Sequence, residues 1–199
     1  PDTGGRQDSL ELLHGITREL LSSQPEVQPM LDAVVERLGG WCSPGRVMIT
    51  IMEPGGGQAR IEASHGLSPA ERRRGRYRPG EGVIGRVLDS GHPVLVPSIA
   101  SDPGFLDRTL SRRNLDQAQI AFLCVPVRER GEVIGTLSVD RDGQSAEVLR
   151  DDLQLVEIVA QLIGRAVCQR RDHLEELESL RRENVALGSS SVRDVRPPQ

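Results

Sequence analysis

The sequence contains no lysine and very few aromatic residues. All 25 basic residues of the 199-residue chain are arginine, and the aromatic residues are Trp41, Tyr77, Phe105 and Phe122. With so few rings, base stacking is a poor basis for recognising single-stranded nucleic acid. A formal net charge of -4 also argues against a DNA-binding surface. We therefore expect no direct contact between this segment and nucleic acid.

Long apolar runs and paired cysteine motifs are also absent. No run approaches the roughly 18 apolar residues of a transmembrane helix, and no secretory signal is visible, so we expect a cytoplasmic protein without membrane contact. Cys42, Cys124 and Cys168 lie far apart without Cys-x-x-Cys spacing, which predicts reduced thiols rather than a disulfide framework or zinc site. We expect no metal and no cofactor. Because the first residue is Pro1, we interpret the chain as part of a longer protein.

Helical patterns open the chain. Residues 1–8 are interpreted as a tail, and from Ser9 to Ser22 leucine and isoleucine recur at spacings of three and four, as on one face of a helix. A second such pattern starts at Pro25, a residue suited to the first turn of a helix, and closes at Gly39 and Gly40.

The periodicity then changes to that of strands. Residues 46–52 and 60–64 are β-branched or alternating, and the glycine-rich turn between them predicts an antiparallel hairpin. The two strongest strand patterns are residues 120–128 and 132–140, joined by a tight turn. Three other segments complete this region: a short helix at 82–90, a proline-bounded strand at 92–97 and an irregular stretch at 98–119.

A long amphipathic helix is predicted from Ala146 onward. Its apolar residues follow heptad-like spacing, and the one break in this seam is Arg170. We assign residues 9–170 to one domain, 171–187 to a coiled-coil output helix and 188–199 to a flexible linker.

The order of these elements predicts an α+β fold, with an antiparallel sheet and helices packed on one face. A hydrophobic content of 37% is sufficient for a single, aliphatic core. The apolar seams of the N- and C-terminal helices are expected to pair with a second copy. We therefore predict a homodimer held together by a helical bundle.

Three stretches of the sequence carry a family resemblance. They are IEASHGLSPAERRRGRYRPGEGVIGRV, VPSIASDPGFLDR and FLCVPVRERGEVIGTLSVDR. Together, from Ile61 to Arg141, they resemble the GAF domain of NifA-type activators, the sigma-54-dependent regulators of nitrogen-fixation genes. The later segment LRRENVAL is similar to the helix that leads toward the ATPase domain in that family.

The resemblance implies a GAF fold and a regulatory role without catalytic residues. In that family the domain controls a neighbouring ATPase, and it responds to 2-oxoglutarate in some members and to signalling proteins in others. We therefore expect either a small-molecule effector similar to 2-oxoglutarate or a partner of the nitrogen-signalling or anti-activator kind. Effector binding would shift the population of terminal-helix arrangements, and the segment 188–199 would lead toward the ATPase domain.

Five residues are candidates for binding an effector. Arg78 and Arg86 flank a glycine-rich helix start, where guanidinium groups suit a carboxylate; the alternative is a solvated basic loop. Phe105 lies in the segment that covers the ligand pocket in GAF domains, either as a lid or as ordinary core. Phe122 and Cys124 share one face of a strand because side chains alternate.

Other GAF functions are kept as alternatives. Nitric-oxide-sensing relatives hold non-haem iron with aspartates and a strand cysteine; alignment on Pro126 places that cysteine at Phe122 and an aspartate at Asp140, so iron would need Cys124 as a substitute. Free-methionine sulfoxide reduction needs a nucleophilic and a resolving thiol in an exposed pocket, which the cysteine positions do not favour. Cyclic-nucleotide binding rests on the fold alone. Bilin attachment would require a cysteine within 98–119, where there is none.

Overall fold

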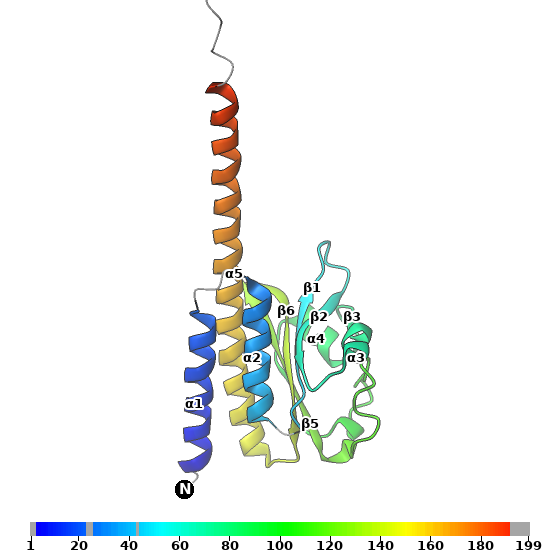
Figure 1. Cartoon of the computed structure of the whole chain (residues 1–199). Helices are drawn as coiled ribbons and strands as arrows, with labels where there is room; N and C mark the ends of the chain where they lie inside the picture. The colour runs from blue at the N-terminus through cyan, green and yellow to red at the C-terminus, as the bar shows by residue number, and fades with distance from the viewer. Residues whose placement is uncertain (1–2, 23–25, 43, 192–199) are drawn as a thin grey trace, which may run out of the picture.

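The computed structural model describes residues 3–22, 26–42 and 44–191 (Figure 1). Helices α1 (Thr3–Leu20) and α2 (Val27–Trp41) come first, and helix α5 (Ala146–Ser191) is the last described element. Between them lie β1 (Val47–Met52), β2 (Ala59–His65), α3 (Pro69–Arg74), β3 (Arg76–Tyr77), α4 (Gly82–Ser90), β4 (Val94–Val96), the 3-10 turns η1 (Ile99–Ser101) and η2 (Gln117–Gln119), β5 (Ile120–Glu129) and β6 (Glu132–Asp142).

The described strands form one antiparallel sheet in the order β3-β2-β1-β6-β5-β4. The predicted hairpin and the predicted long strand pair are both present in it. In the pairing of β5 with β6, Phe122 lies opposite Asp140 and Cys124 lies opposite Ser138. Because opposed residues of antiparallel strands point to the same side, these four side chains share one face of the sheet.

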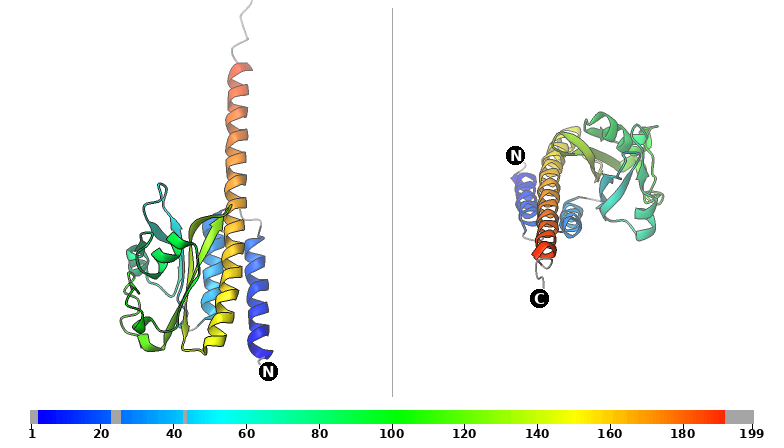
Figure 2. Two further views of the ribbon diagram at one scale, coloured as in Figure 1. Left: turned by 180° about the vertical axis from the view of Figure 1, so that it is seen from behind. Right: turned by 90° about the horizontal axis from the view of Figure 1, so that it is seen from above.

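The long helices cover the other face (Figures 1 and 2). Helices α2 and α5 lie against the sheet, and α1 packs on both of them from outside. The core between these layers is aliphatic, with Ile16 of α1, Val34 of α2 and Ile163 of α5 fully buried. The predicted α+β architecture is confirmed. The short helix α4 lies on the opposite side, where it encloses a second buried cluster.

Two glycines allow neighbouring helices and strands to approach each other closely. A Cβ on Gly164 of α5 would collide with the carbonyl oxygen of Arg128 in β5, and a Cβ on Gly135 of β6 would collide with that of Thr50 in β1. Gly40, near the end of α2, has open space around it instead. The separation of α5 from the sheet therefore depends on the missing side chain at position 164.

Arg170 interrupts the apolar seam of α5 because its side chain binds the end of α1. It is buried, and it donates from Nη1 to the carbonyl oxygen of Leu20 (3.1 Å) and from Nη2 to that of Ser22 (3.2 Å). Carbonyl groups at a helix C-terminus lack partners within the helix, so a guanidinium group satisfies them there. The end of α1 is thereby fastened to α5 near the point where α5 extends away from the sheet (Figure 1).

The helix boundaries differ from the predictions at both ends. Helix α1 begins at Thr3, inside the predicted tail of residues 1–8, and α5 continues to Ser191, past the predicted start of the linker. Residues 192–199 of that linker, and Pro25, lie outside the described residues. No helix in the described part of the chain has the length and apolar character needed to cross a membrane.

Candidate functional site

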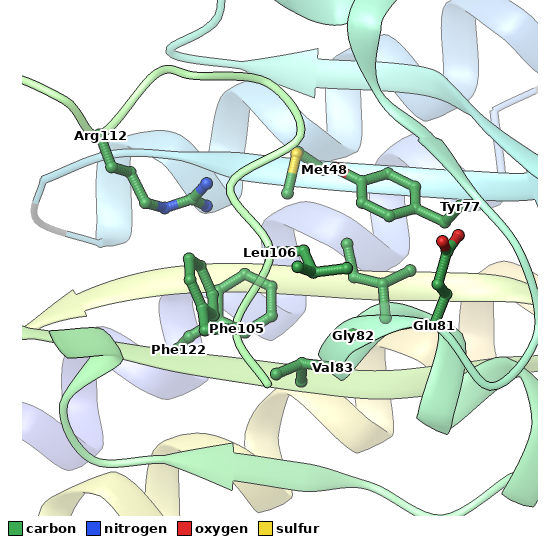
Figure 3. Close-up of a pocket in the computed structure, with 10 residues that line it drawn as sticks. Met48, Tyr77, Glu81, Gly82, Val83, Phe105, Leu106, Arg112 and Phe122 are labelled. Atoms are coloured by element: carbon green, nitrogen blue, oxygen red, sulfur yellow. The ribbon is translucent and has the colours of Figure 1, made fainter. Parts of the chain in front are cut away.

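A small, partly open cavity lies on the sheet face opposite the long helices (Figure 3). The sheet forms one wall, and the start of α4 and the loop 98–119 cover it. The residues that line it are Met48, Tyr77, Glu81, Gly82, Val83, Ile84, Phe105, Leu106, Arg112 and Phe122. Its volume is only about 10 Å³, which is room for about one water molecule.

The cavity is small because side chains of the loop fill the space above the sheet (Figure 3). The rings of Phe105 and Phe122 meet edge to face, with centroids 5.1 Å apart. The guanidinium carbon of Arg112 lies 5.4 Å from the centroid of each ring, within the range of a cation–π contact. The chain therefore fills most of this pocket with its own residues.

Arg112 is a buried cation held by two carboxylates. Its side chain is 2% exposed, and it donates from Nε to Oδ2 of Asp140 (2.8 Å) and from Nη2 to Oδ1 of Asp140 (2.7 Å). Nη1 also donates to Oδ1 of Asp107 at 3.1 Å. Asp140 is fully buried at the end of β6. A two-pronged pair of this kind compensates for the cost of removing both charges from water.

Burial and charge act in opposite directions on this cluster. Burial raises the pKa of the Asp140 carboxyl, and the Arg112 guanidinium opposes that shift. Burial also disfavours the charge on Arg112, but the Asp140 and Asp107 carboxylates and Tyr77 together outweigh it and raise the pKa of the guanidinium. Burial likewise raises the pKa of Tyr77, so its hydroxyl stays neutral at physiological pH. Loss of one partner of the pair would leave the other charge buried without compensation.

The fold brings two of the five candidate residues together at the cavity. Phe105 and Phe122 line it. Cys124 is fully buried on the same strand face as Phe122 but is not among the lining residues. Arg78 is exposed, and Arg86 forms an ion pair near the surface, so neither reaches the cavity.

The cysteines and carboxylates of the described residues do not assemble a metal or dithiol site. No three histidine, cysteine, aspartate or glutamate side chains lie close enough there to hold an ion. Asp140, which aligns with an iron ligand of the nitric-oxide-sensing relatives, is bound to Arg112. Burial raises the pKa of Cys124 to about 12 and that of Cys42 to about 11, so both are protonated thiols. This chemistry does not favour the iron or reductase alternatives.

Sequence reasoning missed Arg112 and Asp107, which carry charge at this site. Arg112 is one of two adjacent arginines in a polar stretch without periodicity, so no local pattern marks it as buried. The available signal was Asp140. Its position opposite Phe122 places a carboxylate on a buried face, and a buried carboxylate requires a cationic partner.

Two adjacent residues of β6 connect the cavity to the helices. Asp140 binds Arg112 on the cavity side. Arg141 donates from Nε to Oδ2 of Asp152 in α5 (2.8 Å), and its guanidinium carbon lies 4.2 Å from the ring centroid of Trp41 in α2. The end of β6 therefore holds the covering loop on one side and two helices on the other.

This combination of a curved antiparallel sheet, a covering loop and flanking terminal helices defines the class of the protein. The chain belongs to the GAF domain family, whose model matches residues 26–167. Among solved structures, it is similar to the A. aeolicus nlh2 GAF domain in an inactive state, with a TM-score of 0.74, 22% sequence identity and coverage of 83% of this chain and 99% of that one.

Within that family, the chain is similar to regulators of nitrogen fixation. It is 33% identical over 189 residues to the nitrogen fixation protein VnfA of Azotobacter vinelandii, covering 94% of this chain and 35% of that protein. It is 34% identical over 170 residues to the Nif-specific regulatory protein of Herbaspirillum seropedicae, covering 85% and 31%. The chain spans about a third of the length of these relatives. The predicted resemblance to the GAF domain of nitrogen-fixation regulators is confirmed.

Proposed function

We propose that this chain is the sensory regulatory domain of a sigma-54-dependent activator of nitrogen-fixation genes, and that it controls a neighbouring ATPase in the cytoplasm. In this proposal residues 9–170 sense the signal, 171–187 form the output helix and 188–199 lead toward the ATPase domain. The similarity to nitrogen-fixation regulators supports the role. The extension of α5 beyond the sheet supports the route of output (Figure 1).

The input that the site supports best is a partner protein of the nitrogen-signalling or anti-activator kind. The observation that carries this choice is the small volume of the cavity. Its volume of about 10 Å³ compares with roughly 300–1,000 Å³ for typical ligand sites. Phe105 and Arg112 occupy the space that a metabolite would need. A surface of the domain, rather than its cavity, would then receive the signal.

A small dicarboxylate such as 2-oxoglutarate is the second candidate, and Arg112 is the observation that favours it. The guanidinium group already binds carboxylates, and a ligand carboxylate would replace that of Asp107 if Asp107 moved away while Arg112 stayed bound to Asp140. The exchange would gain little electrostatic energy, because Asp107 and Asp140 already neutralise the cation.

Either input would act by favouring one arrangement of the terminal helices in a homodimer. The supporting observation is a set of leucines on the part of α5 that lies beyond the sheet. Leu174, Leu177 and Leu180 are 41%, 39% and 50% exposed. Leu174 and Leu177 have the spacing of a coiled-coil seam, so pairing with a second copy of α5 would bury them, with Leu180 at the edge of the seam. A change in that pairing would reach the ATPase domain.

Thermal unfolding of the chain with 2-oxoglutarate, with succinate and cyclic nucleotides as controls, separates the two inputs. A ligand at one hundred times its dissociation constant would stabilise the fold by about 2.7 kcal/mol. For a protein input we expect no shift of the midpoint with any of them. A shift with 2-oxoglutarate alone, reduced by Arg112→Lys, would instead identify the dicarboxylate as the effector, because lysine lacks the two-pronged geometry.

The regulatory role is tested in the intact activator with a reporter gene under a nitrogen-fixation promoter. Deletion of residues 1–187 should abolish the response of the reporter to nitrogen status. A response that survives the deletion unchanged would contradict the proposal.

A further inference from the structure

We propose that an arginine groove at the end of the sheet is the docking site for an acidic peptide segment of a partner protein. The groove lies between β2, α3 and β3 and has an open volume of about 520 Å³. Its charged lining is Arg60, Glu62, Arg72, Arg73 and Arg76. This inference rests on the proposed protein input and names the surface that receives it.

The charge of the arginine groove is opposite to that of the chain as a whole. Four arginines and one glutamate line it, whereas the formal net charge of the protein is -4. A concave surface lined by one sign of charge raises the local concentration of partners of the other sign. It also orients them on approach. The groove is therefore selective for an acidic partner.

Two of these arginines are available for a partner. Arg60 and Arg76 already form ion pairs, the first from Nη2 to Oε2 of Glu62 (3.1 Å) and the second from Nη1 to Oε1 of Glu53 (2.8 Å). Within the described part of the chain, no ion pair involves Arg72 or Arg73. Arg72 and Arg73 are consecutive in the sequence and form no such ion pair, so their guanidinium groups suit the carboxylates of a second chain.

The shape of the groove favours an extended segment over a small anion. Its arginines come from three different elements, and they line an open groove instead of converging on one buried point. Ile61 and Gly75 add an apolar floor, which a phosphate would not use. An extended peptide with acidic residues separated by small apolar ones matches both features. β3 is an edge strand of the described sheet, so such a segment would lie along that edge.

The arginine groove is connected to the loop that closes the cavity. Arg74, the last residue of α3, donates from Nε and Nη2 to the carbonyl oxygen of Thr109, at 3.1 and 2.7 Å. The hydroxyl of Thr109 in turn donates to Asp107, which binds Arg112. A segment docked on α3 would thus act on the cluster that joins the loop to β6.

The test uses fluorescence anisotropy of the chain with a labelled peptide of alternating glutamate and alanine. We expect binding that weakens as salt is raised from about 50 to 500 mM. The double variant R72E/R73E should weaken it by about tenfold or more, because two attractions become two repulsions. The matched control R181E/R182E makes the same change of charge at two adjacent, exposed arginines of α5. It should stay within about twofold of the unaltered chain.

Three results would overturn the proposal. Absence of peptide binding at low salt would show that the groove is not a docking site. Equal weakening of binding by both double variants would show that the peptide is attracted by the overall charge of the chain and not by the groove. Binding of tripolyphosphate at the groove without binding of the peptide would assign it to small anions instead. Because these measurements use the chain alone and not a promoter, their failure leaves the result of the promoter reporter unaffected, and the two proposals fail separately.

Discussion

Arg112 places a permanent charge in a part of the domain that has almost no room for water. A buried ion pair contributes little net stability compared with apolar residues of the same volume, but loss of one partner is severe. The pair joins residues that are far apart in sequence, in the covering loop and at the end of β6. The main role of the pair is therefore to hold the loop 98–119 in place over the sheet.

Replacing Arg112 with methionine should lower the free energy of unfolding by about 3–5 kcal/mol, because Asp140 would remain as a buried charge without a partner. Urea denaturation measures the loss. The double variant Arg112→Met/Asp140→Leu should recover a large part of it, since neither charge is then present. A loss below about 1 kcal/mol in the single variant would mean that water reaches Asp140 in the folded protein.

Cys168 should be the one cysteine that reacts with iodoacetamide in the folded chain. Cys42 and Cys124 are buried, whereas Cys168 is partly exposed. Desolvation and the Asp172 carboxylate raise the pKa of Cys168, and the thiolate is the reactive form. The rate at which Cys168 is labelled should therefore rise by about tenfold per pH unit between pH 7 and 8. It should reach no plateau by about pH 9, because the thiol is not yet fully ionised there.

Mass spectrometry of the labelled peptides measures these rates, and denaturant supplies the control in which all three cysteines react. Rapid labelling of Cys124 without denaturant would be the contrary result. It would show that the loop 98–119 opens and exposes the sheet face beneath it.

Helix α5 and strand β5 are in contact because position 164 carries no side chain. Gly164→Ala should destabilise the fold by about 1–3 kcal/mol, because the added methyl group meets the carbonyl oxygen of Arg128 and forces the helix away from the sheet. Thermal and urea unfolding both measure this change.

Gly40→Ala in α2 is the matched control, since it adds the same group to a helix with open space around it. It should stabilise the protein by up to about 1 kcal/mol through helix propensity. If Gly164→Ala were equally stabilising, the close approach of α5 to β5 would not be a constraint on the fold.

The elements differ in how far the sequence predicts them. Apolar periodicity was sufficient to predict α2, the strand pair β5 and β6, and α5, because each of these elements buries one regular face. The segment 98–119 has no such face, since it covers the cavity with single side chains such as Phe105 and Arg112. Which of two adjacent arginines is buried depends on the tertiary position of Asp140, which no local pattern encodes. The ends of α1 and α5 were misplaced because they lie beyond the packed core, where periodicity is weak.

For the whole molecule, the exposed leucines of α5 predict a homodimer in solution. Sedimentation equilibrium should give twice the mass of the chain, and Leu174→Glu/Leu177→Glu should shift it to the monomer, because like charges would face each other in the seam. The monomeric variant should still fold, and its melting temperature should fall only because it no longer gains stability from dimerisation. Leu110→Glu, at an exposed loop position, is the control and should leave the mass unchanged. A monomeric unaltered chain would exclude the helical bundle.

The hydrogen bonds from Arg170 to the end of α1 couple the movement of α1 to that of α5. From Arg170 to Ser191 the helix extends for about 30 Å at 1.5 Å per residue. A rotation of about 10° around this anchor would carry the far end through about 5 Å, roughly one helical turn. Because α1 is tied to the pivot, it must turn with α5 or lose its terminal hydrogen bonds. In the proposed output mechanism, α5 would therefore pivot at Arg170, and the length of the helix beyond it would determine how far its end moves.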